Sequence, residues 1–382
     1  MLPPRRRLDD PDTIRDAYAG RLWPDEQVRV FANTDRMFPT RTVACGERVR
    51  PLPASRRSLD GFVFESGGAT YDLYDYLSRN RIAGLLVLKD GEVVLERYEL
   101  GVREDTRWMS MSMAKSISST LVGAAIRDGY IDSVDDPLVR YVPELKRGAY
   151  SDVTVRQLLR MSSGARWNES QTDPVSERRR VLELQIAQQP ATILQYMAGL
   201  PKEAPAGRRW NYSTGETHIV GVLLRAATGA WLADYLSERI WSRAGMQADA
   251  AWWLEAPEGL EIAGSGLSAT LRDYARFGQF MLEGGVADNR PVLPDAWVAE
   301  AGDGYAIDGE PIPYGYMWWP VPAPGGEPGC YNGFSARGIF GQRLHINPAH
   351  GLVIAMASAR SKPMYSETIT DNDFFNAVSK AL

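Results

Sequence analysis

Apolar and polar positions follow a strand period near the start of the ordered pattern. The stretch IAGLLVLKDGEVVLERYELG, residues 82–101, contains two runs rich in β-branched residues that are joined at Asp90-Gly91. An Asp-Gly pair between such runs is a strong hairpin signal, because both central residues of the tight turn need a positive φ. We therefore expect this segment to form a hairpin in an antiparallel sheet.

The pattern changes to a helical period from about residue 110 to about residue 290. TVRQLLRMSSG has the spacing of a capping box at Thr154 and Gln157, which predicts a helix that ends at Gly164. Further helices are expected over 215–229 and 231–246. Another is expected over 268–285, where four apolar residues share one face: Leu271, Tyr274, Phe277 and Met281.

Strand character returns late in the chain, and the fold class follows from this order. Residues 340–358 predict two strands around Asn347-Pro348, and residues 371–382 predict a closing helix. We expect a mixed α+β fold, an antiparallel sheet flanked by helices with an inserted all-helical lobe. Its α/β lobe would span about 75–110 and 290–382, its helical lobe about 111–290, and the cleft between them is the expected ligand site.

Composition narrows the classes of function. The chain has 382 residues, 44% of them hydrophobic, and a net charge of −5, which gives no basic stripe for nucleic acid and no polybasic membrane surface. The Pro- and Arg-rich residues 1–60 predict a leader that wraps the core of a catalytic domain at 61–382. Acidic residues follow the N-terminal arginines where a signal peptide would be apolar, and no run approaches the roughly 18 apolar residues of a membrane span. We expect a cytoplasmic protein.

The cysteine and histidine positions give little indication of a metal site or a disulfide. Cys45 and Cys330 lie far apart and form no ligand pattern, so a disulfide framework or zinc site is not expected. The three histidines, His218, His345 and His350, form no zinc-protease motif. Neither a metal nor another cofactor is predicted.

The segment Ser112-Met113-Ala114-Lys115 carries the main chemical signal. It contains the only S-x-x-K in the chain, at the start of a predicted buried helix, where residues three apart share a face. A neutral amine can take the proton of a serine hydroxyl and make it a nucleophile. Burial and the positive end of the helix dipole both favour the neutral amine. To act as a base near pH 7, the amine needs a pKa about 3 below that of a free lysine. The alternative is a chance match in a solvated first turn.

Two later segments add candidate groups. Tyr212 lies before a helix start in RRWNYSTGETHIVG and could carry protons between a nucleophile and a leaving group; an ordinary rim tyrosine is the alternative. Gly338 and Gly341 bracket Ile339 and Phe340 where a strand begins. Glycine there permits close approach of a substrate to the backbone, and a plain β-bulge is the alternative.

The order of these segments resembles the serine β-lactamase and penicillin-binding-protein superfamily from about residue 75 onward. Within it, SMSMAKS, YSTGETHIVG and GIFGQRL are most similar to 6-aminohexanoate-dimer hydrolases, with class C β-lactamases and family VIII esterases next. The resemblance implies that Ser112 is the acylated nucleophile, Lys115 its base and Tyr212 the second proton carrier. The backbone N–H groups of Ser112 and Ile339 would form the oxyanion hole, and a homodimer would be the assembly.

The sequence also departs from the family pattern. Thr214 stands where the tyrosine motif usually ends in Asn, and Ala336-Arg337-Gly338 lacks the usual Lys or His. Efficient turnover of penicillins is therefore not expected unless Arg337 points into the cleft. The candidates for substrate contact are Trp167, Glu169, Asp173, Gly338 and Trp318. The two acids are equally consistent with solvated loop charges, and the tryptophans with core packing.

Three functions remain open at this point. The preferred one is a serine hydrolase that cleaves amides or esters of small carboxylic acids, and a carboxylesterase or weak β-lactamase is the alternative. A non-catalytic relative that keeps the fold would explain the departures, but the nucleophile and its base are both present. β-Lactamase or peptidase activity on cell-wall substrates conflicts with the expected cytoplasmic location.

Overall fold

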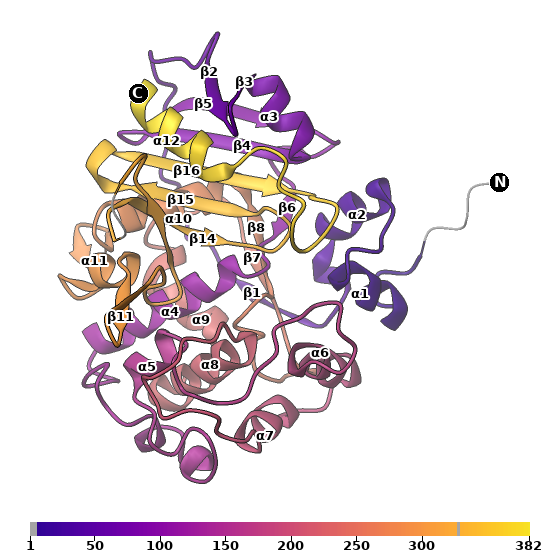
Figure 1. Ribbon diagram of the computed structural model, residues 1–382, viewed down its shortest axis with the longest axis vertical. Helices are drawn as coiled ribbons and strands as arrows, with labels where there is room; N and C mark the ends of the chain where they lie inside the picture. The colour runs from indigo at the N-terminus through magenta and orange to yellow at the C-terminus, as the bar shows by residue number, and fades with distance from the viewer. Residues whose placement is uncertain (1–5, 327–328) are drawn as a thin grey trace.

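The central feature of the fold is a six-stranded sheet in which all neighbouring strands are antiparallel. The computed structural model describes residues 6–326 and 329–382. The strand order is β13-β14-β15-β16-β4-β5, so strands from early in the chain pair with strands from its end (Figure 1). The bounds are β4 Ile82–Lys89, β5 Glu92–Tyr98, β13 Trp319–Pro322, β14 Tyr331–Arg337, β15 Arg343–Asn347 and β16 Leu352–Ser358.

The predicted hairpin is confirmed. β4 and β5 pair antiparallel, and the turn residues Asp90 and Gly91 have φ values of 52° and 82°. The mixed fold class is confirmed as well, since helices cover both faces of this antiparallel sheet (Figure 1).

The two faces of the sheet are apolar and pack against different helices. On one face, residues such as Leu86 and Val353 pack against α10, Leu271–Leu282, whose predicted apolar side is buried. On the other face, residues such as Leu85 and Ile354 pack against α3, Leu73–Arg79, and α12, Asp371–Ala381. Because successive strand residues point to opposite faces, these strands are apolar at nearly every position.

A second, four-stranded sheet takes two of its strands from the part of the chain that the pattern predicts to be helical. Its order is β1-β7-β8-β6, with bounds β1 Thr40–Val43, β6 Arg107–Met109, β7 Ala250–Trp253 and β8 Leu267–Thr270. The expectation of a helical pattern over about 110–290, and of an all-helical lobe there, is therefore wrong for β7 and β8. All eight residues of these two strands are buried. Ala250–Trp253 has no alternation of apolar and polar residues, and Leu267–Thr270 alternates over only four residues that run into the helix predicted over 268–285.

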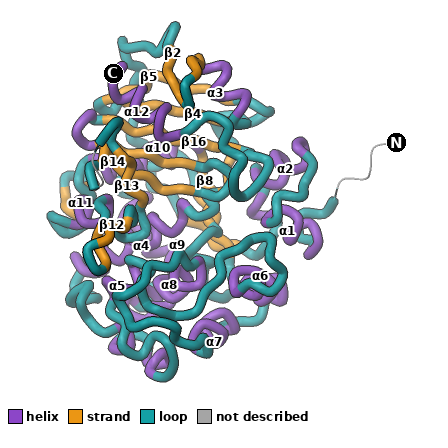
Figure 2. The backbone as a smooth tube through the Cα atoms, in the orientation of Figure 1, coloured by secondary structure: helices purple, strands orange, loops and turns teal. Residues whose placement is uncertain are grey.

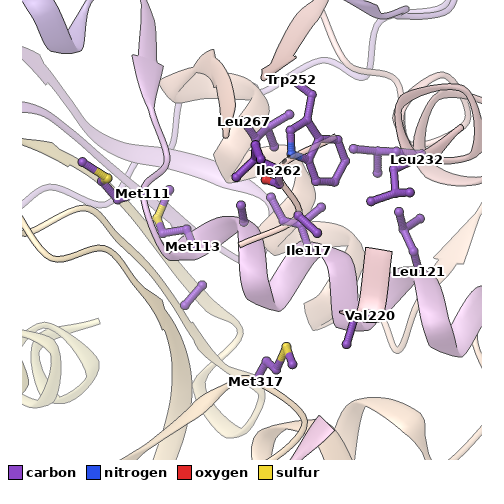
Figure 3. Close-up of a cluster of buried hydrophobic side chains, with 14 of the residues drawn as sticks. Met111, Met113, Ile117, Leu121, Val220, Leu232, Trp252, Ile262, Leu267 and Met317 are labelled. Carbon is purple, nitrogen blue, oxygen red and sulfur yellow. Dashed lines mark hydrogen bonds between the residues drawn. The ribbon is translucent and has the colours of Figure 1, made fainter. Parts of the chain in front are cut away.

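Helices fill the half of the molecule below the large sheet (Figure 2). Their bounds are α4 Met113–Arg127, α5 Val155–Leu159, α6 Glu177–Ala187, α7 Thr192–Ala198, α8 Thr214–Thr228, α9 Leu232–Leu236 followed by a π-helical turn Ser237–Trp241, and α11 Trp297–Gly302. α4 is buried along almost its whole length. In Figure 3 its residues Ile117 and Leu121 lie among Val220 of α8, Leu232 of α9 and Trp252 of β7.

The N-terminal segment has more regular structure than its sequence pattern suggests. It contains α1 Pro11–Tyr18 and α2 Pro24–Phe31, each with proline at the first helical position. Ile14 and Tyr18 of α1 and Phe31 of α2 join the main apolar core. Helices of eight residues give too few turns for a periodic signal, so their burial is a tertiary effect.

The capping box at Thr154 and Gln157 is present, but its helix α5 ends at Leu159 rather than at Gly164. Met161 has a φ of 51°, which a right-handed helix does not permit. The remaining elements are short hairpins and 3₁₀ turns: β2 Val63–Ser66, β3 Ala69–Asp72, β9 Val286–Ala287, β10 Arg290–Pro291, β11 Tyr305–Ile307, β12 Glu310–Ile312, and 3₁₀ turns Thr34–Arg36, Leu138–Arg140, Pro143–Lys146 and Pro348–His350.

The packing of α4 against α11 gives a prediction about stability. A Cβ at Gly123 would lie 2.6 Å from the ring of Trp297. Helix propensity alone predicts that Gly123→Ala stabilises α4 by about 1 kcal/mol. We expect the clash to dominate, so that the variant loses roughly 1–3 kcal/mol of unfolding free energy in urea titrations. The double variant with Trp297→Leu should recover part of this loss; a more stable Gly123→Ala protein would contradict the packing described.

Candidate active site

Ser112 lies at the turn where the chain passes from β6 into α4. The amide of Ser110 donates to the carbonyl of Leu267, which continues the pairing of β6 with β8, and Met111 then has a φ of 45°. A left-handed backbone conformation is uncommon for a residue other than glycine. Here it turns the chain so that Ser112 becomes the N-cap of α4. Ser112 is 8% exposed, whereas Ser116, Ser118 and Ser119 on the same helix are sealed in the core. The hydroxyl at position 112 is therefore the accessible one in this group.

The amine of Lys115 lies within hydrogen-bonding distance of that hydroxyl. Its Nζ is 3.0 Å from Ser112 Oγ and donates to the carbonyl oxygen of Gly264 at 2.8 Å. Lys115 is 1% exposed, and burial lowers the pKa of its amine to about 7. The opposing charges of Glu169, which raises this pKa, and Arg178, which lowers it, act as smaller effects. A large fraction of the amine is thus neutral near pH 7.

Gly264 allows the Lys115 contact because it has no side chain. A Cβ at this position would lie 3.0 Å from Thr214 Cγ2 and 3.4 Å from Lys115 Nζ. The loop before β8 therefore approaches both α4 and the start of α8 closely. The sequence analysis missed Gly264, since a single glycine in an apolar segment carries no signal of its own.

Tyr212 lies beside this pair, two residues before α8 begins. The Lys115 amine is 5.2 Å from the centre of the Tyr212 ring, and α4 and α8 pack along their lengths. Burial raises the pKa of the Tyr212 phenol well above its usual value, with a further rise from the Glu169 charge and a small opposing effect from the Ser112 hydroxyl. The phenol is thus a proton donor throughout the neutral range. Ser112, Lys115 and Tyr212 are brought together in the structure.

The turn after β14 lies against the segment that begins α4. A Cβ on Gly338 would be 2.8 Å from the carbonyl oxygen of Ser110, so only glycine fits there. Ile339 follows and is half-buried. Neither the Ser112 nor the Ile339 amide N–H donates a hydrogen bond to any residue in 6–326 or 329–382. Both amides are therefore available to an oxygen atom of a substrate.

Glu169 is not a solvated loop acid. Its carboxylate accepts hydrogen bonds from Trp167 Nε1 at 2.6 Å and from the amide of Thr214 at 2.9 Å, and the Thr214 hydroxyl also donates to it. Arg178 lies 3.9 Å away and balances its charge. Glu169 and Trp167 thus hold the start of α8, just beyond Tyr212.

Two of the candidates for substrate contact have other roles. Trp318 is fully buried and packs edge-on against Phe334, so the prediction that it contacts substrate is wrong. Its neighbour Trp319 is the half-buried one, and its ring centre is 5.6 Å from that of Tyr212. Asp173 accepts from the side chain of Asn168 and the amide of Val175, which stabilises its own loop.

Arg337 is engaged with the C-terminal helix. Its guanidinium donates to Asn372 Oδ1 at 3.2 Å and lies over the ring of Trp319 at 5.6 Å. Burial, with the nearby positive charge of Arg343, lowers the pKa of Arg337 to about 10. Within the described residues, no hydrogen bond or ion pair joins Arg337 to Ser112 or Lys115.

The described residues contain no group of three His, Cys, Asp or Glu side chains arranged to hold a metal ion. Cys45 and Cys330 are both free. Within the same residues no single helix is long and apolar enough to cross a membrane; α8 and the segment 232–241 reach that length only as a pair bent by 76°.

Comparison with known proteins gives the family. The sequence profile described as "Beta-lactamase" matches residues 75–375. The chain belongs to the beta-lactamase family. A 6-aminohexanoate-dimer hydrolase from Paenarthrobacter ureafaciens is 30% identical over 348 residues, which cover 87% of this chain and 85% of that protein. The beta-lactamase family consists of serine hydrolases, and this relative is itself a hydrolase. The chain is therefore a serine hydrolase.

Solved structures agree with this assignment. A Bacillus anthracis structure, provisionally assigned as a 6-aminohexanoate-dimer hydrolase, has a TM-score of 0.77 at 26% identity and covers 95% of both chains. A family VIII carboxylesterase has a TM-score of 0.62 at 18% identity and covers 81% of this chain and 95% of its own. The second likeness shows a shared fold only. The resemblance predicted for residues 75 onward is confirmed.

The buried amine gives a prediction for stability against pH. The folded pKa of Lys115, about 7, is below the value of 10.5 for a free lysine, so between these values the unfolded chain binds more protons and stability rises with pH. In Lys115→Met this rise should be missing, and the wild-type protein should gain roughly 4 kcal/mol on the variant between pH 7 and 10. Denaturant titrations at several pH values measure the difference.

Lys146→Met, at an exposed lysine, is the control for that experiment and should follow the wild-type curve. Parallel curves for wild type and Lys115→Met across this range would mean that the folded protein does not neutralise the amine.

Proposed function

We propose that this beta-lactamase family member hydrolyses an amide or ester bond of a small carboxylic acid derivative through an acyl-enzyme on Ser112. The observation that carries the proposal is the 3.0 Å contact between Lys115 Nζ and Ser112 Oγ at a buried position. An amine with a pKa of about 7 is a base matched to neutral pH. The contact supplies both the nucleophile and the group that activates it.

Acylation then proceeds from these groups. Lys115 takes the hydroxyl proton as Ser112 Oγ forms a bond to the substrate carbonyl carbon, and the carbonyl π electrons move onto its oxygen. The amide N–H groups of Ser112 and Ile339, which have no acceptor among the described residues, donate to this oxyanion. Each such donor is typically worth about 3 kcal/mol of barrier. Because main-chain groups act here, the geometry at Gly338 matters more than the side chain of Ile339.

Collapse of the tetrahedral intermediate needs a second proton carrier. As the bond from carbon to the leaving nitrogen or oxygen breaks, the Tyr212 phenol donates its proton to that atom. The Lys115 ammonium, beside the Tyr212 ring, returns a proton to the phenolate. Water then attacks the acyl-enzyme by the reverse sequence of transfers, and Ser112 regains its proton as the acid leaves.

Two substrate types have support. The relative from Paenarthrobacter ureafaciens acts on the 6-aminohexanoate dimer, which favours an amide of that kind here. The surroundings of Tyr212 favour a simple ester as the alternative. Tyr314 and Trp319 pack against its ring, Trp210 packs in turn against Trp319, and Glu169 is already paired. The engagement of Arg337 with Asn372 argues against efficient penicillin turnover.

The nucleophile is tested by substitution. Ser112→Ala should lose labelling by a fluorophosphonate and lower kcat/KM for a p-nitrophenyl ester by at least about 10³-fold, because no other group can form the acyl-enzyme. The same variant is assayed on the linear 6-aminohexanoate dimer and on nitrocefin. The relative kcat/KM values of the three substrates in the wild-type enzyme decide between amidase, esterase and β-lactamase.

Ser119→Ala is the matched control, since Ser119 lies on α4 and is sealed in the core. It should label and turn over as the wild type does. A Ser112→Ala protein that still labels would overturn the proposal, and labelling of the wild type without turnover would support the non-catalytic alternative.

The role of Tyr212 depends on the leaving group. An aliphatic amine or alcohol must be protonated as it departs, whereas p-nitrophenolate leaves without help. Tyr212→Phe should therefore lower kcat by roughly 10²- to 10⁴-fold on the 6-aminohexanoate dimer or an alkyl ester. On the p-nitrophenyl ester of the same acid the loss should be at least tenfold smaller. Equal losses on the two kinds of substrate would contradict proton donation by Tyr212.

A further inference from the structure

The N-terminal helix α1 lies outside residues 75–375, yet its last residue contacts the surroundings of Lys115. Tyr18 is 1% exposed. Its hydroxyl lies 3.3 Å from Ser265 Oγ, and the guanidinium of Arg178 lies 4.7 Å from the centre of its ring, in the range of a cation–π contact. One side chain of α1 thus contacts two different segments behind the site.

Both contacts continue to the reacting groups. Ser265 follows Gly264, whose carbonyl accepts the hydrogen bond from Lys115 Nζ. Arg178 is 3.9 Å from Glu169, which in turn holds the amide of Thr214 next to the Tyr212 motif. Tyr18 is therefore linked to Lys115 through the Gly264–Ser265 loop. It is linked to the Tyr212 motif through Arg178 and Glu169.

The guanidinium of Arg178 contacts both Tyr18 and Glu169. Its side chain is 4% exposed, and none of its guanidinium nitrogens donates a hydrogen bond to a residue within the described ranges. Its close partners there are the Tyr18 ring and the Glu169 carboxylate. α1 itself is held independently, because Arg15 pairs with Glu183 of α6 at 2.7 Å. Loss of the Tyr18 ring should therefore release Arg178 without releasing α1.

We propose that Tyr18 is a positioning residue for the reaction, which holds Arg178 against Glu169 and the Gly264–Ser265 loop against Lys115. The inference rests on the proposed function, since it assigns a role only if Lys115 is the base. The N-terminal segment thus contributes to the reaction, although it lies outside residues 75–375, which match the family profile.

The expected effect follows from the charges that face Lys115. These are Glu169 from the loop before α6, which favours the protonated amine, and Arg178 from α6, which disfavours it; Tyr212 faces it as a neutral phenol. When Arg178 moves away, Glu169 acts without compensation and the pKa of Lys115 rises. The acid limb of the rate profile must then move to higher pH, because only the neutral amine activates Ser112.

The test is the pH dependence of kcat/KM for a p-nitrophenyl ester, from pH 5 to 9. The wild-type acid limb is expected near pH 7. Tyr18→Leu should move it up by about 0.5 pH unit, a roughly threefold loss of rate below the midpoint, and Arg178→Met should move it by at least as much. The double variant should move it no further than Arg178→Met alone, since both changes take the Arg178 charge away from Lys115. Additive shifts, or an unmoved limb in Tyr18→Leu, would overturn the inference.

The other contact is tested by the conservative change. Tyr18→Phe keeps the ring over Arg178 and removes the bond to Ser265, so the acid limb should stay in place while kcat falls a few-fold and KM is unchanged. Ser265→Ala should give the same loss, and the pair together no more than either. This arm remains decisive if Tyr18→Leu fails to fold, because independent losses in Tyr18→Phe and Ser265→Ala would contradict the bracing role.

Val30→Ala in α2 is the control for simple destabilisation, since Val30 is buried in the same N-terminal segment and makes neither contact. It should lower the melting temperature and leave the acid limb unmoved. A shift of the limb in Val30→Ala like that in Tyr18→Leu would overturn the specific role of Tyr18. Failure of the proposed function would be seen separately, as an active Ser112→Ala enzyme.

Discussion

The buried amine of Lys115 constrains the elements that pack around it. Lys115 lies inside the first turn of a helix that is otherwise packed in the apolar core, and it has two partners, the Ser112 hydroxyl and the Gly264 carbonyl. A buried lysine opposes folding at neutral pH because its charged form is poorly solvated there. The surrounding core offsets this cost, with Ile117 and Leu121 packed among α8, α9 and β7 (Figure 3).

Several features of the fold follow from the need to surround that amine closely. Glycine at position 264 lets the loop before β8 approach α4, and glycine at 338 lets the turn after β14 approach the start of the same helix. The packing of α4 on α8 brings Tyr212 to the pair. Elements from three separate parts of the chain thus meet at Ser112, which is how a rigid scaffold positions reacting groups within a few tenths of an ångström.

The charges nearest the site are arranged in opposition. Glu169 stabilises the start of α8 by hydrogen bonds, but its charge also favours the protonated amine, and Arg178 compensates for it. Burial, with a further effect of the same carboxylate, raises the pKa of Tyr212 and keeps the phenol protonated. Glu169 therefore favours the protonated form of both groups, which suits the donor Tyr212 and is offset by Arg178 at the base Lys115.

The sequence by itself determined the features that depend on local period and spacing. The Asp90-Gly91 hairpin, the apolar side of α10 and the closing helix α12 are all read from neighbouring residues, and so is the pairing of Ser112 with Lys115, since three residues separate them on one helix. Only the tertiary structure decided that β7 and β8 are strands, that Trp318 is sealed in the core, and that Gly264, Arg178 and Tyr18 stand behind the amine. These residues come from loops and short helices far apart in the chain, where burial rather than periodicity fixes the conformation, and burial is a property of the folded whole.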